Sequence, residues 1–471
     1  MRLLETELYR AELKTRMPFR YGIATMTALP HVFLTVSCEF AGRRQSGVAA
    51  DHLPPKWFTK DPSKDPVAEI ADMIGAIQQA QRHARAVESA PTVFAFWREM
   101  WDRQERWARA GSVPELLAQF GTSLVERAVV DAFCRARGQP FRSMLLSNEF
   151  GIDLGSIHAE LAGTAPRDWL PGRPPHRVFA RHTVGLADPL TEKEISRGER
   201  ARDGLPQSLE DCIAAYGLRH FKLKVGGPDD LPRLVSIAGV LTRAAPPDYA
   251  CSVDGNEAFG TVAGFKAFWD EACGAPELAD LRRRLMFIEQ PFHRGIALSD
   301  AIGVLAAEWP DRPPIIIDES DAGLGSVPRA LVLGYAGTSH KNCKGVFKGI
   351  ASACLIARRR RLLPDSRLLL TGEDLANIGP VALLQDLAVQ AALGVPSVER
   401  NGHHYFAGLS CWPAVLQARM RERHPDLYTD SSLGWPTLRI ENGQISVDSV
   451  LAAPFGVGFD FEPASVAQLV R

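Results

Sequence analysis

The sequence predicts an α/β protein in which a (β/α)₈ barrel of parallel strands follows an N-terminal α+β domain. Three observations favour this fold class. Residues 1 to about 50 alternate apolar and polar side chains, as antiparallel strands do, around the turn-rich segment RMPFRYGIATMTALP, where we expect a long loop. From about residue 65 to residue 146 the apolar period becomes helical. From residue 178 to residue 400, eight short apolar segments recur at intervals long enough for a helix.

The first domain, expected over residues 1–152, combines a small sheet with helical segments. Its strand candidates are LETELYRAEL and HVFLTVSCEF. Its helical segments are PVAEIADMIGAIQQAQRHARAV, VFAFWREMWDRQERWARA and SLVERAVVDAFCRARGQPFRSML.

The barrel is expected over residues 178–400. Its strand candidates are VFARHTV, RHFKLKV, YACSVDG, LMFIE, PIIID, TSHKNC, RLLLTG and PSVER. A doubly wound open sheet is the competing fold, but it would favour a Gly-rich turn after the first strand, and VGLADP is not one. The last segment, residues 401–471, is expected to pack back on the first domain, with TLRIENGQISVDS forming a hairpin.

Composition excludes several classes of protein. The chain has 471 residues, more than one compact core usually holds, and a formal net charge of −1, which offers no basic field for nucleic acid or anionic lipid. The eight cysteines include no C-x-x-C pair, which argues against a disulfide framework or a thiolate zinc site and predicts a cytoplasmic protein. We expect neither a signal peptide nor a membrane span, because no apolar stretch is long enough.

Two lysines lie near the end of the second strand candidate. Lys222 and Lys224 are two residues apart and therefore share one face of the strand. If that face is the barrel interior, crowding of two ammonium groups in a poorly solvated site depresses the lysine pKa and makes a neutral amine base attainable near neutral pH. Two exposed lysines on a solvated strand are the alternative interpretation.

Carboxylates end the next three strand candidates. Asp254, Glu289 and Asp318 each follow an apolar run and lie about one βα unit apart. Converging on one point, they would repel each other without a compensating cation. Oxygen ligands suit Mg²⁺ better than zinc. Each carboxylate alone would be interpreted as a helix cap or a surface ion pair, but together with the lysines they predict a metal site.

The sixth strand candidate, TSHKNCKG, carries Lys341 and Lys344. Their spacing of three predicts opposite faces of a strand, so only one can point inward. A lysine across the barrel from Lys224 could return a proton to the opposite face of a substrate carbon. A solvated lysine at a loop mouth is again the alternative.

The order K-x-K, Asp, Glu, Asp, Lys along a barrel that follows an α+β domain resembles the enolase superfamily, and more closely its mandelate racemase and muconate lactonizing enzyme branch. The resemblance spans nearly the whole chain. SLVERAVVDAFCRARGQPFRSMLL is similar to the long helix that ends the family's capping domain, and FKLKVGG, SVDGN, FIEQPF and IIIDES stand in the expected order. The resemblance implies a Mg²⁺-dependent enzyme that removes the proton α to a carboxylate through a metal-stabilised enediolate.

The resemblance also implies roles for single residues. The implied Mg²⁺ ligands are Asp254, Glu289 and Asp318. Lys224 is implied as the base on one substrate face, Lys222 as the group that supports it and the substrate carboxylate, and Lys341 as the acid or base on the other face. Asn256 is like an asparagine that relatives place near the metal, and Glu319 is an alternative ligand to Asp318.

Departures from the family pattern narrow the chemistry. Lys341-x-x-Lys344 is similar to the start of K-x-x-K-x-G-G, but Val346 and Phe347 occupy the two Gly positions, so Lys344 stays an alternative to Lys341. LLLTGEDLAN contains Glu373 but no His, so the His/Asp dyad of mandelate racemase is missing and two-lysine chemistry is favoured. SVERNGHHYF lacks the D-x-D of dipeptide epimerases, which argues against a dipeptide substrate.

The reaction after deprotonation stays open. Reprotonation gives racemisation or epimerisation, cycloisomerisation uses the same site, and loss of a β-substituent makes the enzyme an acid-sugar or hydroxy-acid dehydratase. The loops over residues 19–27 and 50–58 are expected to close over the barrel mouth. The substrate-binding candidates are Arg20, Tyr21, His52, Asn256, Glu319, Lys344, Glu373 and Arg400.

Two other classes compete with this interpretation. A barrel aldolase would use one lysine as a Schiff base, but it would not need three carboxylates on adjacent strands. A barrel that has lost catalysis should have lost one of the six charged positions, and all six are present. The expected partner is a small-molecule carboxylate, not nucleic acid or a membrane, and a homo-oligomer is expected by analogy with relatives.

Overall fold

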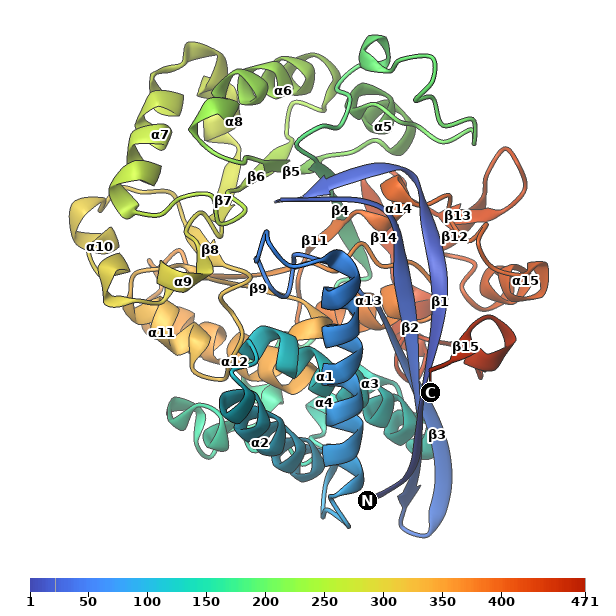
Figure 1. Ribbon diagram of the computed structural model, residues 1–471. Helices are drawn as coiled ribbons and strands as arrows, with labels where there is room; N and C mark the ends of the chain where they lie inside the picture. The colour runs from blue at the N-terminus through green and yellow to red at the C-terminus, as the bar shows by residue number, and fades with distance from the viewer. Residues whose placement is uncertain (22, 471) are drawn as a thin grey trace.

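The computed structural model describes residues 1–21 and 23–470. It confirms the predicted fold class (Figure 1): eight parallel strands close into a barrel, and an antiparallel sheet with four helices precedes it. Closure is direct, because the last barrel strand pairs in parallel with the first.

The N-terminal sheet consists of β1 (Arg2–Tyr21), β2 (Ala24–Phe40) and β3 (Arg43–His52). The prediction of a long loop between the first two strands is wrong, because β1 and β2 stay paired beyond an irregularity in register, with Phe19 opposite Met26. Both side chains are buried, so an apolar face continues through a segment whose composition is typical of turns.

The helices of this domain are α1 (Pro66–Arg85), α2 (Val93–Gly111), α3 (Glu115–Arg137) and α4 (Phe141–Leu146). Asp65 and Thr92 cap the N-termini of α1 and α2 with side-chain oxygens that accept from backbone N–H groups. α3 is buried along most of its length and packs on β3. The approach is so close that a Cβ on Gly47 would lie 2.2 Å from a backbone oxygen of α3.

The eight barrel strands coincide with the predicted segments, except that β4 and β9 each begin one residue earlier. They are β4 (Arg177–Val184), β5 (His220–Lys224), β6 (Ala250–Asp254), β7 (Leu285–Glu289), β8 (Ile315–Ile317), β9 (Gly337–His340), β10 (Leu369–Gly372) and β11 (Ser397–Arg400). The helices that follow them are α5 (Leu209–Tyr216), α6 (Leu231–Ala244), α7 (Val262–Gly274), α8 (Ala279–Arg283), α9 (Arg294–Ala297), α10 (Leu305–Glu308), α11 (Ser326–Val332), α12 (Val346–Leu362), α13 (Ala382–Ala392) and α14 (Gly402–Tyr405).

The C-terminal segment adds pieces to both sheets. Its elements are α15 (Ala414–Arg423), β12 (Tyr428–Asp430), β13 (Pro436–Leu438), β14 (Gln444–Ser446), α16 (Asp448–Ala452) and β15 (Gln468–Leu469). The predicted hairpin forms only at its turn, where Glu441 and Gln444 make an antiparallel bridge. Its two arms then pair elsewhere: β13 pairs with β12, whereas β14 pairs with barrel strand β4. β15 pairs with β1 in the N-terminal sheet.

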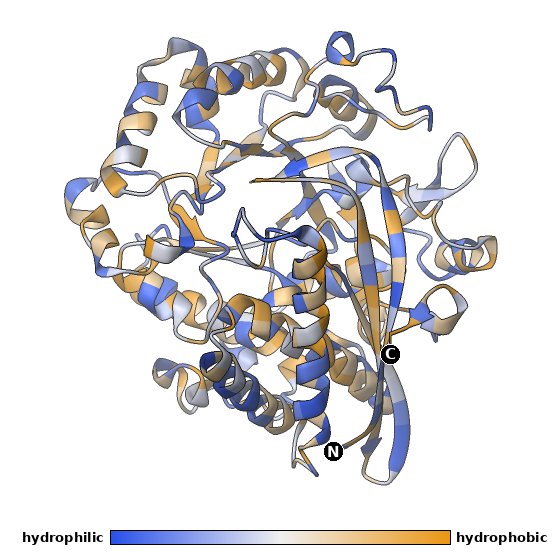
Figure 2. Ribbon diagram, viewed as in Figure 1, coloured by the Kyte–Doolittle hydropathy of each residue, from blue (hydrophilic) through white to orange (hydrophobic). Residues whose placement is uncertain are grey.

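One continuous cluster of buried apolar side chains joins the N-terminal domain to the barrel. Figure 2 shows hydrophobic residues along the barrel strands and hydrophilic residues on outer helices such as α2. The shared core fixes the N-terminal sheet against the barrel, with the paired ends of β1 and β2 at its mouth. None of the helices in the described ranges combines the length and apolarity needed to cross a bilayer.

Candidate active site

The C-terminal ends of the barrel strands bring lysines and carboxylates together. The charged side chains in this group are Lys222, Lys224, Asp254, Glu289, Asp318, Lys341, Lys344, Glu373 and Glu399. Each is at most 8% exposed. Buried charges at this density must be compensated by one another or by a bound ion.

Lys222 lies at the centre of the group. Its Nζ is 2.9 Å from Glu289 Oε1 and from Glu373 Oε2. It is also 3.0 Å from Glu399 Oε2 and from Asp254 Oδ2. Burial opposes the charge on Lys222, but these carboxylates outweigh burial and hold the pKa of Lys222 well above its usual value.

Lys224 shares one of these partners. Its Nζ donates to Asp254 Oδ2 and to Asn256 Oδ1, both at 2.9 Å. Burial lowers the pKa of Lys224, but the carboxylate of Asp254 raises it by more, so the net shift is upward. The prediction that crowding depresses the pKa of these lysines is therefore wrong for this arrangement, because carboxylates surround them.

Lys341 approaches from the opposite wall of the barrel. Its Nζ lies 2.5 Å from Asp318 Oδ2 and 3.0 Å from Glu373 Oε2. The ammonium also lies over the ring of Trp57, 4.8 Å from the ring centroid. Trp57 comes from the N-terminal domain, so that domain helps to hold Lys341.

Lys344 contacts the other side of the same carboxylate. Its Nζ donates to Asp318 Oδ1 at 2.8 Å and to the Ser339 carbonyl at 2.7 Å. The strand argument for opposite faces does not apply, because β9 ends at His340 and the chain then forms a 3₁₀ turn. Its consequence holds in the described residues: Lys341 lines the cavity described below, whereas Lys344 lies behind Asp318.

The carboxylate group fits a divalent cation. One oxygen each from Glu289, Asp318 and Glu373 lies within 4.8 Å of the other two. Glu289 Oε2 is buried and has no hydrogen-bond partner among the described residues, so this oxygen is open to a cation. Burial, followed by the nearby Glu373 carboxylate, raises the pKa of Glu289 well above its usual value. Asp254 lies next to this trio, on the other side of Lys222.

A cavity of about 50 Å³ opens onto this group. Lys222, Lys224 and Lys341 line it from the barrel. Phe19 and Trp57 line it from the N-terminal domain, so each of the two segments expected at the barrel mouth contributes a side chain.

Two buried charges of this group were not among the predicted site residues. Glu399 accepts from Thr183 Oγ1 at 2.5 Å as well as from Lys222. Arg181, inside β4, donates to Glu373 Oε1 at 2.9 Å. The sequence offered two signals: Arg181 is a charge inside the strand candidate VFARHTV, and Glu399 is a charge one residue before the end of PSVER.

Several predicted substrate-binding residues lie elsewhere. Arg20 is exposed near the end of β1, and the side chain of Tyr21 lies outside the described part of the chain. His52 packs against His31, with the two Nδ1 atoms 3.0 Å apart. Arg400 forms a buried ion pair with Asp374. The described side chains of Arg20, His52 and Arg400 do not line the cavity.

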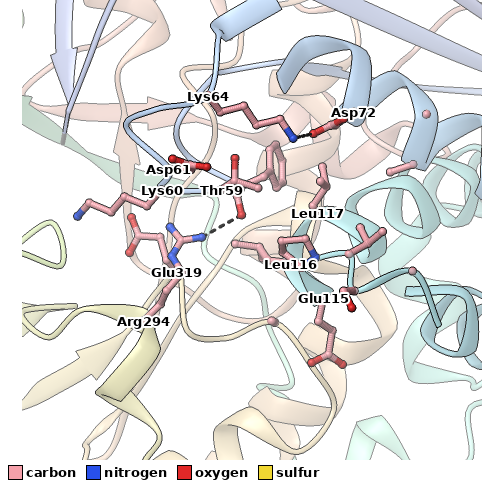
Figure 3. Close-up of a pocket in the computed structure, with 18 of the residues that line it drawn as sticks. Thr59, Lys60, Asp61, Lys64, Asp72, Glu115, Leu116, Leu117, Arg294 and Glu319 are labelled. Carbon is pink, nitrogen blue, oxygen red and sulfur yellow. Dashed lines mark hydrogen bonds and ion pairs between the residues drawn. The ribbon is translucent and has the colours of Figure 1, made fainter. Parts of the chain in front are cut away.

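Glu319 links this cavity to a larger one of about 950 Å³ between the N-terminal helices and the loops after β7 and β8 (Figure 3). Arg294 lies beside Glu319 in this view, and Lys64 and Asp72 form an ion pair across the upper wall. Burial and the neighbouring Asp318 raise the pKa of Glu319 to about 8. Its Oε2 is buried without a hydrogen-bond partner.

Gln290 fixes the geometry between two of the acidic strand ends. It adopts a left-handed conformation, with φ of 34°, immediately after Glu289. Its Oε1 accepts from the backbone N–H of Asp318 at 2.7 Å, and its Nε2 donates to Ser320 Oγ at 2.8 Å. The amide thereby ties the end of β7 to the end of β8.

No protein-family model and no curated protein matches this chain. Solved structures do. A muconate lactonizing enzyme from Pseudomonas fluorescens, complexed with muconolactone, aligns over 99% of this chain and 99% of its own, with a TM-score of 0.60 and 17% identity. An N-succinyl Arg/Lys racemase from Bacillus cereus aligns over 100% of both chains, with a TM-score of 0.59 and 15% identity.

A dipeptide epimerase from Enterococcus faecalis, complexed with Mg and a dipeptide, aligns over 94% of this chain and 100% of its own, with a TM-score of 0.56 and 12% identity. All three likenesses extend over the N-terminal domain as well as the barrel. The chain therefore has the fold of the enolase superfamily, as found in its mandelate racemase and muconate lactonizing enzyme branch.

Proposed function

We propose that this protein is a Mg²⁺-dependent enzyme of the enolase superfamily that removes the proton α to a carboxylate of a small-molecule substrate. The observation that carries the proposal is the placement of Lys224 and Lys341. The two lysines come from β5 and from the end of β9, which lie four strands apart in a closed barrel of eight and therefore face each other across it. Both line the same cavity, with carboxylates between them.

Asp254, Glu289 and Asp318 would hold the cation, with Glu373 beside them. A bound Mg²⁺ supplies positive charge that polarises the substrate carboxylate, stabilises the enediolate and offsets the carboxylates that raise the lysine pKa. The open oxygen of Glu289 supports this assignment. The dipeptide epimerase that shares this fold is complexed with Mg, which supports the choice of metal.

The chain's own residues divide the proton transfers. Lys224 removes the proton from one face of the α-carbon, and Lys341 delivers a proton to the other face. Lys222, held among four carboxylates, supports Lys224 and the substrate carboxylate. Phe19 and Trp57 close the cavity from above and exclude water from the site.

The product of this chemistry is a racemised, epimerised or cycloisomerised carboxylate. The named activities of the similar structures, a muconate lactonizing enzyme, a racemase and an epimerase, support this isomerase assignment. A second candidate is an acid-sugar or hydroxy-acid dehydratase at the same site. Glu319 supports it, because this acidic side chain lines the cavity and its buried Oε2 has no hydrogen-bond partner among the described residues, so it could deliver a proton to a leaving hydroxyl.

Hydrogen exchange tests the proposal. The protein is incubated with Mg²⁺ in D₂O and pooled acid sugars, hydroxy acids and N-acyl amino acids, and loss of the α-proton signal is followed by NMR. Exchange without net product indicates a racemase or epimerase, a lactone or rearranged isomer indicates a cycloisomerase, and a keto or unsaturated acid indicates a dehydratase.

Variants complete this test. We expect Lys224→Ala and Lys341→Ala to lose activity by about 10²–10⁴-fold. Lys266→Ala, on the outer face of α7, is the control and should exchange at the wild-type rate. Wild-type exchange in Lys224→Ala would refute the assignment of the base.

The eight cysteines are all free, which supports the predicted cytoplasmic location. The homo-oligomer stays a prediction.

A further inference from the structure

A second group of metal-ligating side chains lies between the first and last barrel strands, away from the carboxylates. It consists of His182 on β4, Cys212 on α5 and His404 on α14. One ligand atom of each lies within 4.8 Å of the other two, and each residue is at most 3% exposed. The proposed function uses none of them.

The distance between Cys212 Sγ and His404 Nδ1 matches tetrahedral zinc geometry. Cys212 Sγ and His404 Nδ1 are 3.6 Å apart. In a tetrahedral site with Zn–S of about 2.3 Å and Zn–N of about 2.0 Å, a sulfur and a nitrogen ligand lie about 3.5 Å from each other. An ion can therefore bridge these two atoms without a large movement of either side chain.

The surroundings of His404 resemble the outer shell of a metal site. While Nδ1 faces the sulfur, Nε2 lies 3.9 Å from Asp188 Oδ2. Asp188 is itself held by the Tyr405 hydroxyl at 2.6 Å and the Gly185 N–H at 2.7 Å. A carboxylate facing the second nitrogen of a metal-binding histidine orients the ring and raises its basicity.

A third imidazole, that of His403, adjoins the group. His403 Nε2 lies 3.2 Å from His182 Nδ1. His403 Nδ1 is buried and has no hydrogen-bond partner in the described structure. His403 therefore adjoins His182 but lies outside the set of three, and either its ring or a water molecule would supply a fourth ligand.

We propose that His182, Cys212 and His404 bind a Zn²⁺ ion at a structural site separate from the Mg²⁺ cluster. One sulfur and two imidazole nitrogens select zinc over magnesium. On binding, the Cys212 thiol releases its proton to solvent and coordinates as the thiolate. The proposal does not depend on the proposed function, since the two sites share no residue.

The ion would tie together three segments that lie far apart in the chain. α14 contributes more than a ligand, because Tyr405 on the same helix stacks on Phe19, with ring centroids 3.9 Å apart. Arg16 of β1 also donates to the backbone oxygen of His404 at 3.1 Å. Phe19 lines the candidate active-site cavity, so a zinc ion that holds α14 in place would also stabilise the position of Phe19.

Cysteine spacing along the chain gave no sign of this group. It argued against a site built from several thiolates, and the group here has a single sulfur joined by imidazoles from other segments. The competing explanation is a simple hydrogen bond between the Cys212 thiol and His404. Metal content and spectroscopy distinguish the two.

The experiment uses the full chain, produced in medium supplemented with Zn²⁺ and purified in buffer containing Mg²⁺ to fill the carboxylate cluster. Elemental analysis should find about one zinc ion per chain. Cys212→Ser and His404→Ala should lose this zinc. Cys251→Ser is the matched control, because Cys251 is also fully buried but its sulfur contacts only the Leu281 carbonyl; it should keep the zinc.

Protein produced with Co²⁺ in place of Zn²⁺ gives an independent measurement on the unaltered chain. A thiolate-to-cobalt charge-transfer band in the near ultraviolet is expected for the wild type and for Glu289→Gln, which alters only the carboxylate cluster. Absence of this band together with absence of zinc in the wild type would overturn the proposal, even if the Cys212 variant fails to fold. Full zinc content in Cys212→Ser would overturn it too.

Discussion

Lys222→Met would remove the one cation that contacts four carboxylates at the centre of the barrel. The Lys222 ammonium lies 2.9 to 3.0 Å from oxygens of Asp254, Glu289, Glu373 and Glu399. Methionine keeps an unbranched side chain of similar length, so the change removes charge more than volume. Removing one partner of a buried ion pair costs about 3–5 kcal/mol, and we expect a loss of this size in the free energy of unfolding without divalent cations.

Mg²⁺ should restore more stability to this variant than to the wild type. A cation bound to the carboxylates supplies the charge that the lysine supplied, whereas in the wild type the cation must first displace lysine contacts. Binding at one hundred times the dissociation constant stabilises a folded protein by about 2.7 kcal/mol. The assay is urea unfolding followed by circular dichroism, with chelator and with excess Mg²⁺.

Lys224→Met is the matched control, because Lys224 contacts a single carboxylate, that of Asp254. It should lose clearly less stability than Lys222→Met. Equal stability of Lys222→Met and the wild type in chelator would refute the inference that Lys222 neutralises the carboxylate group. Equal stabilisation of both proteins by Mg²⁺ would refute the inference that the cation and the lysine compensate the same charges.

Three further predictions follow from other contacts. Burial raises the pKa of Glu126, which accepts from two backbone N–H groups at the start of α12, to about 7. The protonated Glu126 therefore stabilises the folded protein fully below pH 4.5, and this contribution falls as the pH rises to 7. Between these two pH values the wild type should lose about 3 kcal/mol of unfolding free energy relative to Glu126→Gln. Parallel pH profiles of the two proteins would contradict this. Lys341→Ala should abolish proton return in the exchange assay. Lys344→Ala should reduce it far less, because Lys344 lies behind Asp318. The reverse order of effects would identify Lys344 as the acid. Gly47→Ala should lower the unfolding free energy by about 1–3 kcal/mol, because the new Cβ would meet the backbone of α3. Gly75→Ala on α1 should not lower it, because a Cβ there meets open space. Equal melting temperatures of the two variants would show that β3 can move away from α3.

The barrel strands were predictable because each is a short apolar run that ends in polar residues, and parallel strands repeat that pattern at helix-length intervals. The continued pairing of β1 and β2 was not, because composition describes single residues and pairing is a property of two strands. The segment carries residues typical of turns, yet Phe19 and Met26 are buried opposite each other across the pair.

The candidate site was predictable where position alone decides it. Asp254 and Glu289 end strands of a parallel barrel, so they face its mouth whatever their neighbours are. Glu399 was not predicted, because the adjacent Arg400 is also charged and a shift of one residue exchanges the faces of a strand. The β11–β4 pairing, which decides between them, joins residues too far apart in the chain for a local pattern to show.

The error about the lysine pKa has a chemical consequence. Counting Lys222 and Lys224 alone predicts mutual repulsion and a lowered pKa, but carboxylates in β6, β7 and β11 and just after β10 reverse the sign of the shift. A lysine in this environment is a poor base until something else neutralises those carboxylates. Because linkage is reciprocal, a cation that lowers the lysine pKa must itself bind more tightly when the lysine is neutral. Under the proposed function, metal binding and activation of the base would therefore form a single coupled equilibrium that involves the four carboxylates around Lys222.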